Sequence, residues 1–145
     1  MSEQPNTVNK TLKDDRPLDD VQTDVRQTIL VVEDEPAVRV MVADFLIKEG
    51  YNVLTAEDGL AALRVCDNHQ GPIHLLLTDI VMPEMGGIEL AGRIAVMRTD
   101  TKILFMSGYV DVSTYEQNLC IEGYQGLVQK PFSPGALLEK LNEIL

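Results

Sequence analysis

Short hydrophobic runs alternate with longer amphipathic segments along most of the chain. The run at 29–32 is aliphatic and mostly β-branched, and no polar residue interrupts it. This pattern is typical of a strand that is buried on both faces of a parallel sheet. Apolar residues then recur at helical spacing from Pro36 until Gly50, where glycine favours the end of a helix. The first unit of the pattern is therefore a strand followed by a helix.

The same unit recurs to the end of the chain. The further strands that we expect lie at 52–56, 74–79, 103–106 and 126–129. The further helices that we expect lie at 60–68, 88–97, about 111–121, and from Pro134 onwards after a Ser133 cap. Five strand–helix units in succession predict an α/β fold of the flavodoxin-like type. Such a fold is a doubly wound, parallel five-stranded sheet with helices on both faces.

The first 27 residues differ in composition from the rest of the chain. They are polar and bury too little apolar surface to fold alone, so we expect a flexible tail at 1–27 and one domain at 28–145. Leu18, Val21 and Val25 are spaced i, i+3 and i+7. This spacing leaves open a short amphipathic helix that docks on the domain or contacts a partner.

Charge and composition limit the possible functions. A formal net charge of -11 would repel nucleic-acid phosphates, so we expect no nucleic-acid binding. No run of about 18 apolar residues is available to span a membrane, and no signal peptide precedes the domain, so we expect a cytoplasmic protein. Cys66 and Cys120 are too few and too far apart for a disulfide framework or a zinc site.

The polar residues at the strand ends are the candidates for function, because ligands of open parallel sheets bind at the carboxyl ends of strands. The first strand ends in Glu33 and Asp34, the third in Asp79, the fourth in Ser107 and the fifth in Lys130. Two carboxylates 4 Å apart repel by about 4 kcal/mol at an effective dielectric of 20, so this cluster needs cations. The lysine supplies part of the positive charge. Mg²⁺, which binds carboxylate oxygens and keeps several waters, can supply the rest.

A site of this kind suits phosphoryl transfer to a carboxylate. Aspartate is a weak nucleophile, and the incoming phosphoryl group is negative, so catalysis depends on positioning and charge neutralisation. Mg²⁺ can bridge Asp79 and the phosphoryl oxygens, Lys130 can neutralise another oxygen, and the Ser107 hydroxyl can donate to a third. We therefore interpret Asp79 as a phosphoacceptor. A proline and two glycines, Gly86 and Gly87, break the pattern after it.

Four motifs at these positions resemble the receiver domain of two-component response regulators. They are the pair Glu33-Asp34, the run Thr-Asp-Ile-Val-Met-Pro-Glu-Met-Gly-Gly around Asp79, Met-Ser-Gly-Tyr around Ser107, and Lys-Pro-Phe from Lys130. They occur in the family's order and on the expected strands, and the resemblance covers about 28–145. The residues in and around the last two motifs are similar to those of receivers attached to hybrid histidine kinases.

The resemblance implies roles for the acidic residues. Asp79 would take a phosphoryl group from a phosphohistidine in a Mg²⁺-dependent reaction. Asp34 would bind Mg²⁺ directly, and Glu33 would act mainly through metal-bound water. The backbone carbonyl of Val81 would be a further metal ligand.

The resemblance also implies how the domain signals. Ser107 would move towards the phosphoryl group, Lys130 would pair with it, and the bond between Lys130 and Pro131 would be cis. The family usually carries an aromatic residue three positions before the lysine, and this chain has Leu127 there. In the family, this aromatic side chain swings inward after the serine or threonine moves. A leucine can fill the space that the moving residue vacates but has no polar tip, so we expect the usual aromatic switch to be altered.

The partners implied by the resemblance are a histidine kinase or a histidine phosphotransfer protein. The domain would promote its own phosphorylation and dephosphorylation as a signalling domain rather than as an enzyme. The chain ends with its fifth expected helix, so we expect no attached output domain. A downstream protein could instead bind the fourth helix, fifth strand and fifth helix, and both a stand-alone receiver and a part of a hybrid kinase stay open.

Two other functions place similar residues on a similar fold. An aspartyl-nucleophile phosphatase of the haloacid dehalogenase type needs a second aspartate two residues after Asp79, where this chain has Val81. A flavodoxin-like cofactor-binding module needs a phosphate cradle after the first strand, where acidic residues stand here. Taken alone, Asp34 could be only a helix cap, and Lys130 only a surface charge.

Overall fold

The computed structural model describes residues 26–108 and 121–145. The elements within these residues are, in chain order, β1 (Thr28–Val32), α1 (Pro36–Lys48), β2 (Asn52–Ala56), α2 (Gly59–Asn68), β3 (Leu75–Asp79), α3 (Gly87–Met97), β4 (Lys102–Ser107), β5 (Tyr124–Gln129) and α5 (Pro134–Ile144). The helix expected at about 111–121 lies outside the described residues except for Ile121, and the expected amphipathic segment before Arg26 lies outside them entirely.

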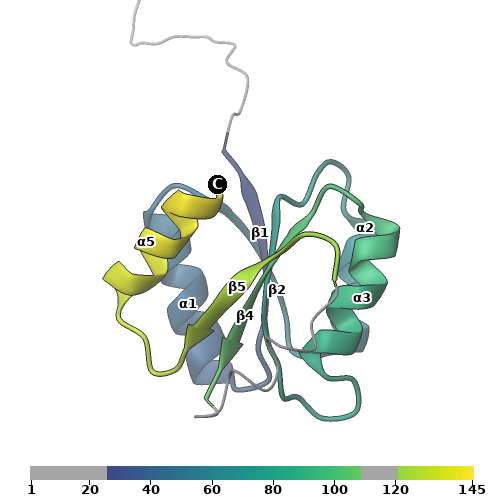
Figure 1. The fold of residues 1–145 in the computed structure, drawn as a ribbon, viewed down its shortest axis with the longest axis horizontal. Helices are drawn as coiled ribbons and strands as arrows, with labels where there is room; N and C mark the ends of the chain where they lie inside the picture. The colour runs from purple at the N-terminus through teal and green to yellow at the C-terminus, as the bar shows by residue number, and fades with distance from the viewer. Residues whose placement is uncertain (1–25, 109–120) are drawn as a thin grey trace, which may run out of the picture.

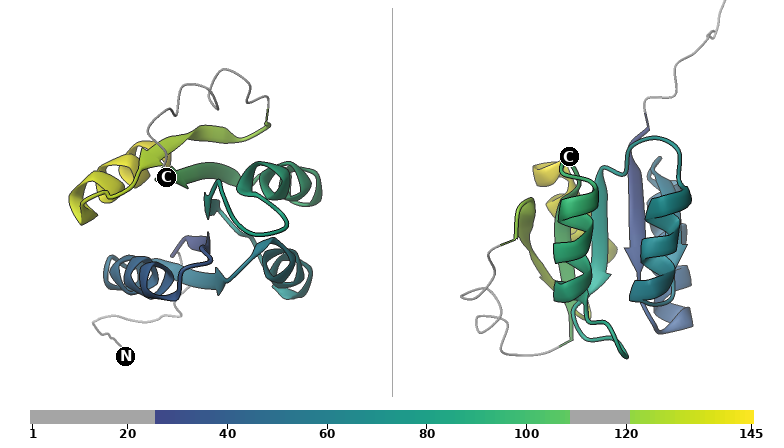
Figure 2. Two further views of the ribbon diagram at one scale, coloured as in Figure 1. Left: turned by 90° about the horizontal axis from the view of Figure 1, so that it is seen from below. Right: turned by 90° about the vertical axis from the view of Figure 1, so that its right-hand side faces the viewer.

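The strands form one five-stranded sheet in the order β2-β1-β3-β4-β5, and every neighbouring pair is parallel. Helices α1 and α5 cover one face, and α2 and α3 cover the other (Figures 1 and 2). The predicted doubly wound α/β fold is confirmed. The winding reverses between β1 and β3, the two central strands that carry the acidic residues at their ends.

The apolar runs are continuous because each central strand contributes side chains to two hydrophobic cores, one on each face of the sheet. In β1, Leu30 and Val32 pack beneath α2 and α3, whereas Ile29 and Val31 pack beneath α1 and α5. All five residues of β1 and all five of β3 are buried. Each fully buried Leu, Ile or Val stabilises the fold by about 1.5–3 kcal/mol, so these two strands anchor the sheet.

The first and last helices begin at Pro36 and Pro134, as the sequence predicts, but only the last has a side-chain cap. The Ser133 hydroxyl accepts a hydrogen bond from the Ala136 amide at 3.1 Å, which confirms the predicted cap of α5. At α1 the cap position belongs to Glu35, in extended conformation and without a side-chain cap hydrogen bond, so Asp34 is not the helix cap. Asp34 is thereby left for another role.

Among the residues that the structure describes, we find no helix with the length and apolar character needed to cross a bilayer.

Candidate functional site

Three acidic side chains meet at the carboxyl edge of the sheet. Because β1 and β3 are neighbours, with Val32 opposite Thr78, the residues that follow them come together. One oxygen from each of Glu33, Asp34 and Asp79 lies within 4.8 Å of the other two. Glu33 is 1% exposed and Asp79 is 8% exposed, whereas Asp34 is exposed to solvent. The convergence expected from the strand ends is present in the structure.

Lys130 joins two of these acids. Its Nζ lies 2.6 Å from Oε1 of Glu33 and 2.9 Å from Oδ2 of Asp79. The backbone helps to place it, because the amide of Lys130, the residue after β5, donates to the carbonyl of Ser107, the last residue of β4, at 2.7 Å. The lysine is thus a bridging ammonium group between two buried carboxylates and not a solvated surface charge. The bond from Lys130 to Pro131 is cis, as expected.

Glu33 has a partner for each of its polar groups. Its amide donates to the Ala56 carbonyl at 3.2 Å, and its carbonyl accepts from Nη1 of Arg39 at 2.8 Å. One carboxylate oxygen pairs with Lys130, and the other accepts from the Glu35 amide at 3.2 Å. Complete pairing is what a buried charged residue requires. Glu33 therefore organises the site as well as adding charge to it.

Burial and charge oppose each other at this cluster. Burial raises the pKa of the Glu33 carboxyl, and the negative charge of Asp79 adds to this, while the hydrogen bond from Lys130 acts in the other direction. Burial alone would lower the pKa of Lys130, but its hydrogen bonds to Glu33 and Asp79 outweigh this and raise it. The cluster holds three carboxylates and one ammonium group, so a further cation would offset the remaining negative charge.

The donor set of the cluster fits Mg²⁺. Hard divalent cations bind carboxylate oxygens, and Mg²⁺ keeps several of its waters. Glu33 and Asp79 supply buried oxygens, and the exposed Asp34 leaves one side of the cluster open to water. Val81, whose carbonyl is the further expected ligand, lies two residues after Asp79 in the loop that follows β3 and is 44% exposed.

A close approach by α3 fixes the backbone of Asp79. The Gly87 amide donates to the Ile80 carbonyl at 2.7 Å, and a Cβ atom added at Gly87 would lie 1.9 Å from the Asp79 carbonyl oxygen. Only glycine fits at this position. The sequence analysis identified Gly87 only as a residue that interrupts the hydrophobic pattern. Nothing in the sequence alone indicates that Gly87 packs against the backbone of Asp79.

Ser107 and Leu127 lie on the two strands beyond Asp79. Ser107 ends β4, is fully buried, and follows Met106, which pairs with Asp79 across the sheet. Leu127 lies in β5, is partly buried, and packs against the core beneath α2 and α3. The leucine at the usual aromatic position is thus an apolar contact of the core on this side.

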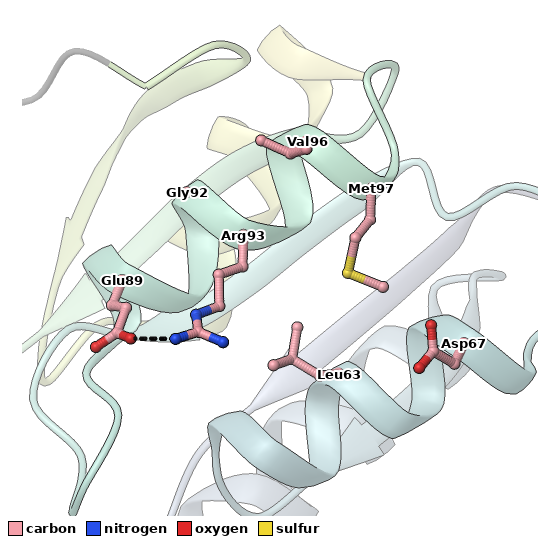
Figure 3. Close-up of a pocket in the computed structure, with 7 residues that line it drawn as sticks. All are labelled: Leu63, Asp67, Glu89, Gly92, Arg93, Val96 and Met97. Carbon is pink, nitrogen blue, oxygen red and sulfur yellow. Dashed lines mark hydrogen bonds and ion pairs between the residues drawn. The ribbon is translucent and has the colours of Figure 1, made fainter.

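A hollow of about 400 Å³ adjoins the site on the side of α1. It is lined by Val38, Met41, Gly108, Lys130, Pro131 and Phe132. A larger hollow, of about 670 Å³, lies between α2 and α3, and Glu33, Asp34 and Asp79 are not among its lining residues (Figure 3). It is lined by Leu63, Asp67, Glu89, Gly92, Arg93, Val96 and Met97. Only the smaller hollow is continuous with the charged site.

The family model and the similar proteins of known identity all point to the same protein family. The response regulator receiver domain family matches residues 29–142. The chain is 36% identical over 118 residues to the sensor kinase CckA of Brucella abortus, a match that covers 81% of this chain and 12% of the kinase. It is 35% identical over 117 residues to the response regulator receiver protein CpdR of the same organism, covering 81% of this chain and 95% of CpdR.

Solved structures agree with these relatives. The response regulator protein TrrA from Thermotoga maritima, solved in complex with Mg²⁺-BeF, superposes with a TM-score of 0.71 at 36% identity. The superposition covers 82% of this chain and 99% of TrrA. The chain therefore corresponds to a small part of the sensor kinase but to nearly all of CpdR and TrrA.

These matches decide between the three functions that the sequence left open. They do not favour a phosphatase of the haloacid dehalogenase type or a flavodoxin-like cofactor-binding module. They confirm the resemblance carried by the four motifs. The similarity to receivers of hybrid kinases is also confirmed, because the receiver domain of the hybrid histidine kinase CckA superposes with a TM-score of 0.69 at 33% identity, over 81% of this chain and 98% of that domain. Receiver domains are signalling domains that interact with histidine kinases or phosphotransfer proteins and bind Mg²⁺ at an acidic site. The chain belongs to the response regulator receiver domains, the phosphoacceptors of two-component signal transduction.

Proposed function

We propose that Asp79 is the residue of this receiver domain that accepts the phosphoryl group, in a Mg²⁺-dependent reaction with a phosphohistidine. The observation that carries the proposal is the position of Lys130, whose ammonium group lies 2.9 Å from Asp79 within a cluster of three carboxylates. Glu33 and Asp34 adjoin this pair but follow a different strand. Glu33 also pairs with the lysine, but it follows β1 and both of its carboxylate oxygens already accept hydrogen bonds. Asp79 is the acid that pairs with the lysine and ends the central strand β3.

The two oxygens of Asp79 have different environments. Oδ2 accepts the hydrogen bond from Lys130, whereas Oδ1 has a long contact of 3.4 Å with the Val81 amide. In the proposed reaction one oxygen forms a bond to phosphorus as the bond from phosphorus to the histidine nitrogen breaks, and the imidazole leaves with the electron pair. Lys130 then neutralises a phosphoryl oxygen, and the hydroxyl of Ser107 donates to another.

The metal ligands in this proposal are Glu33, Asp34, Asp79 and the backbone carbonyl of Val81. When bound, Mg²⁺ supplies positive charge that offsets the negative charge of the incoming phosphoryl group. Asp34 is the exposed carboxylate of the set, so it provides a direct ligand while leaving room for water and phosphoryl oxygens. Glu33 is bound by Lys130 and contributes mainly through metal-bound water.

The proposal includes a docking place for the phosphodonor. A phosphohistidine must reach Asp79, and the hollow lined by Met41, Lys130 and Phe132 is the apolar surface that adjoins the site. Met41 is 57% exposed there. We assign this surface to the histidine kinase or phosphotransfer protein. The fourth helix, β5 and α5 remain the predicted face for a downstream protein, although the fourth helix lies outside the described residues.

Several expectations from the sequence remain predictions within this proposal. They are the tail at 1–27, the domain at 28–145, the absence of nucleic-acid binding, self-catalysed phosphorylation and dephosphorylation, and a cytoplasmic location. Limited proteolysis tests the domain boundary, and cell fractionation tests the location.

The direct test is mass spectrometry after incubation with acetyl phosphate and Mg²⁺, with chemical trapping of the acyl phosphate. We expect one trapped group on Asp79, and Asp79→Asn should abolish it because an amide is not a nucleophile at phosphorus. Asp67→Asn, in the hollow between α2 and α3, is the matched control and should be labelled like the unaltered protein. Persistent acid-labile label on the Asp79 variant would place the acceptor elsewhere.

A further inference from the structure

Arg39 reaches back from α1 to the loop that carries Glu33 and Asp34. Its Nη1 donates a hydrogen bond of 2.8 Å to the backbone carbonyl of Glu33, six residues earlier. Both groups are at least partly buried. The helix cap at Glu35 makes no side-chain hydrogen bond, so capping does not hold this loop. The guanidinium group thus joins the side-chain layer of α1 to the backbone of the loop between β1 and α1.

This contact bears on Asp34 through the planarity of the peptide bond. The carbonyl of Glu33 and the amide of Asp34 belong to one rigid peptide unit. A donor that holds the carbonyl also fixes the direction of the Asp34 amide, and with it the point from which the Asp34 side chain leaves the backbone. Asp34 is exposed, so packing around its own side chain supplies little orientation.

We infer that Arg39 is a positioning residue for Asp34 and thereby for Mg²⁺ binding, an inference that rests on the metal site proposed above. Arginine suits the task because its guanidinium stays charged, presents several donors in a fixed plane, and makes strong hydrogen bonds to oxygen. Groups that orient metal ligands in this way typically change metal affinity by about 10- to 100-fold when they are removed.

A merely structural role makes a different prediction. If Arg39 only stabilised the start of α1, its loss would lower the melting temperature equally with and without Mg²⁺ and would leave the dissociation constant unchanged. If it positions Asp34, the dissociation constant rises and the stabilisation that Mg²⁺ confers on the fold shrinks, because ligand-induced stabilisation follows affinity.

The experiment measures the Mg²⁺ dissociation constant by calorimetry, and the melting temperature in EDTA and in Mg²⁺, on the full chain. Arg39→Gln should raise the dissociation constant about tenfold. Arg39→Lys keeps the charge and an ammonium donor group but loses the planar fork, should recover part of the affinity, and serves as the test variant if Arg39→Gln does not fold. Arg93→Gln removes an arginine from the surface of α3, where it pairs with Glu89, and should bind Mg²⁺ like the unaltered protein.

Asp34→Ala separates failure of this inference from failure of the metal site. If Asp34→Ala loses Mg²⁺ affinity while Arg39→Gln keeps it, the positioning role is overturned and the metal site stands. If Asp34→Ala itself binds Mg²⁺ normally, Asp34 is not a ligand and the role of Arg39 falls with it. A reduced affinity in Arg39→Gln, partly restored in Arg39→Lys, supports the inference.

Discussion

The carboxyl edge of the sheet and the hollow between α2 and α3 both hold a cation beside an acid. At the edge, Lys130 has 20% of its side chain exposed and pairs with Glu33, which has 1%. Between α2 and α3, Arg93 and Glu89 pair at 2.9 Å with 55% and 54% exposed (Figure 3). The surface pair contributes about 0.3–0.5 kcal/mol, whereas loss of one partner from a buried pair costs several times more.

The comparison shows that the size of a hollow does not identify the functional site. The hollow between α2 and α3 is the larger of the two, but its lining is mostly apolar apart from that solvent-exposed pair and Asp67. The smaller one contains Lys130, whose ammonium touches two buried acids. What distinguishes the functional region is charge that the fold has removed from water, because such charge is retained only where it has partners.

The largest difference is expected between the two cations. Lys130→Ala should slow phosphorylation by acetyl phosphate about 100-fold, because it removes a preorganised positive charge from the reacting centre. It should also destabilise the fold by about 3 kcal/mol in EDTA, because buried carboxylates lose their partner. Arg93→Gln should change neither quantity measurably. Equal phosphorylation rates in both variants would remove Lys130 from the reaction.

A second difference is expected between two glycines of α3. Gly87→Ala places a methyl group against the Asp79 carbonyl, so we expect about 2 kcal/mol lower stability and a phosphorylation rate reduced roughly tenfold. Gly92 lines the hollow between α2 and α3, and a Cβ there would meet nothing within 4 Å. Gly92→Ala should therefore stabilise the protein by about 0.5–1 kcal/mol through helix propensity. Urea denaturation and labelling by acetyl phosphate measure both effects.

If Gly87→Ala were as stable and as active as the unaltered protein, the close approach of α3 to Asp79 would not constrain the site. Phosphorylation of Gly92→Ala at the normal rate is the control for general effects of alanine in this helix.

The smallest difference is expected between two exposed hydrophobic residues. Met41→Asp should slow transfer from a phosphorylated histidine phosphotransfer protein roughly fivefold, which corresponds to a free-energy change of about 1 kcal/mol. The reason is that the substitution places a charge in the apolar hollow assigned to the partner. Labelling by acetyl phosphate should be unchanged, since Met41 lines the hollow and has no role in the proposed reaction. Val96, 81% exposed in the other hollow, should tolerate aspartate in both assays. The reverse result would move the partner to the hollow between α2 and α3.

Much of the fold could be predicted because it depends on local patterns. The predicted bounds of β2 at 52–56 agree with the structure, and α2, β3 and α3 begin within one residue of their expected starts. Apolar runs, helical spacing and the Ser133 cap are properties of neighbouring residues. The convergence of the acids at the strand ends could also be predicted from the sequence, because parallel strands present their carboxyl ends at one edge of the sheet.

The contacts that complete the site depend on tertiary structure. Glu33 and Lys130 are 97 positions apart in the chain, and their 2.6 Å distance exists only because β1 and β5 end at the same edge. From the sequence, Asp34 could still be a helix cap. The sequence analysis did not predict a role for Arg39 or a contact between Gly87 and Asp79. By itself, the sequence determined which residues lie at the carboxyl edge, since the carboxyl ends of parallel strands share one edge whatever the order of the strands. Only the packed structure decided which of them touch, since hydrogen bonds and steric fit depend on ångström-scale distances between segments that are remote in the chain.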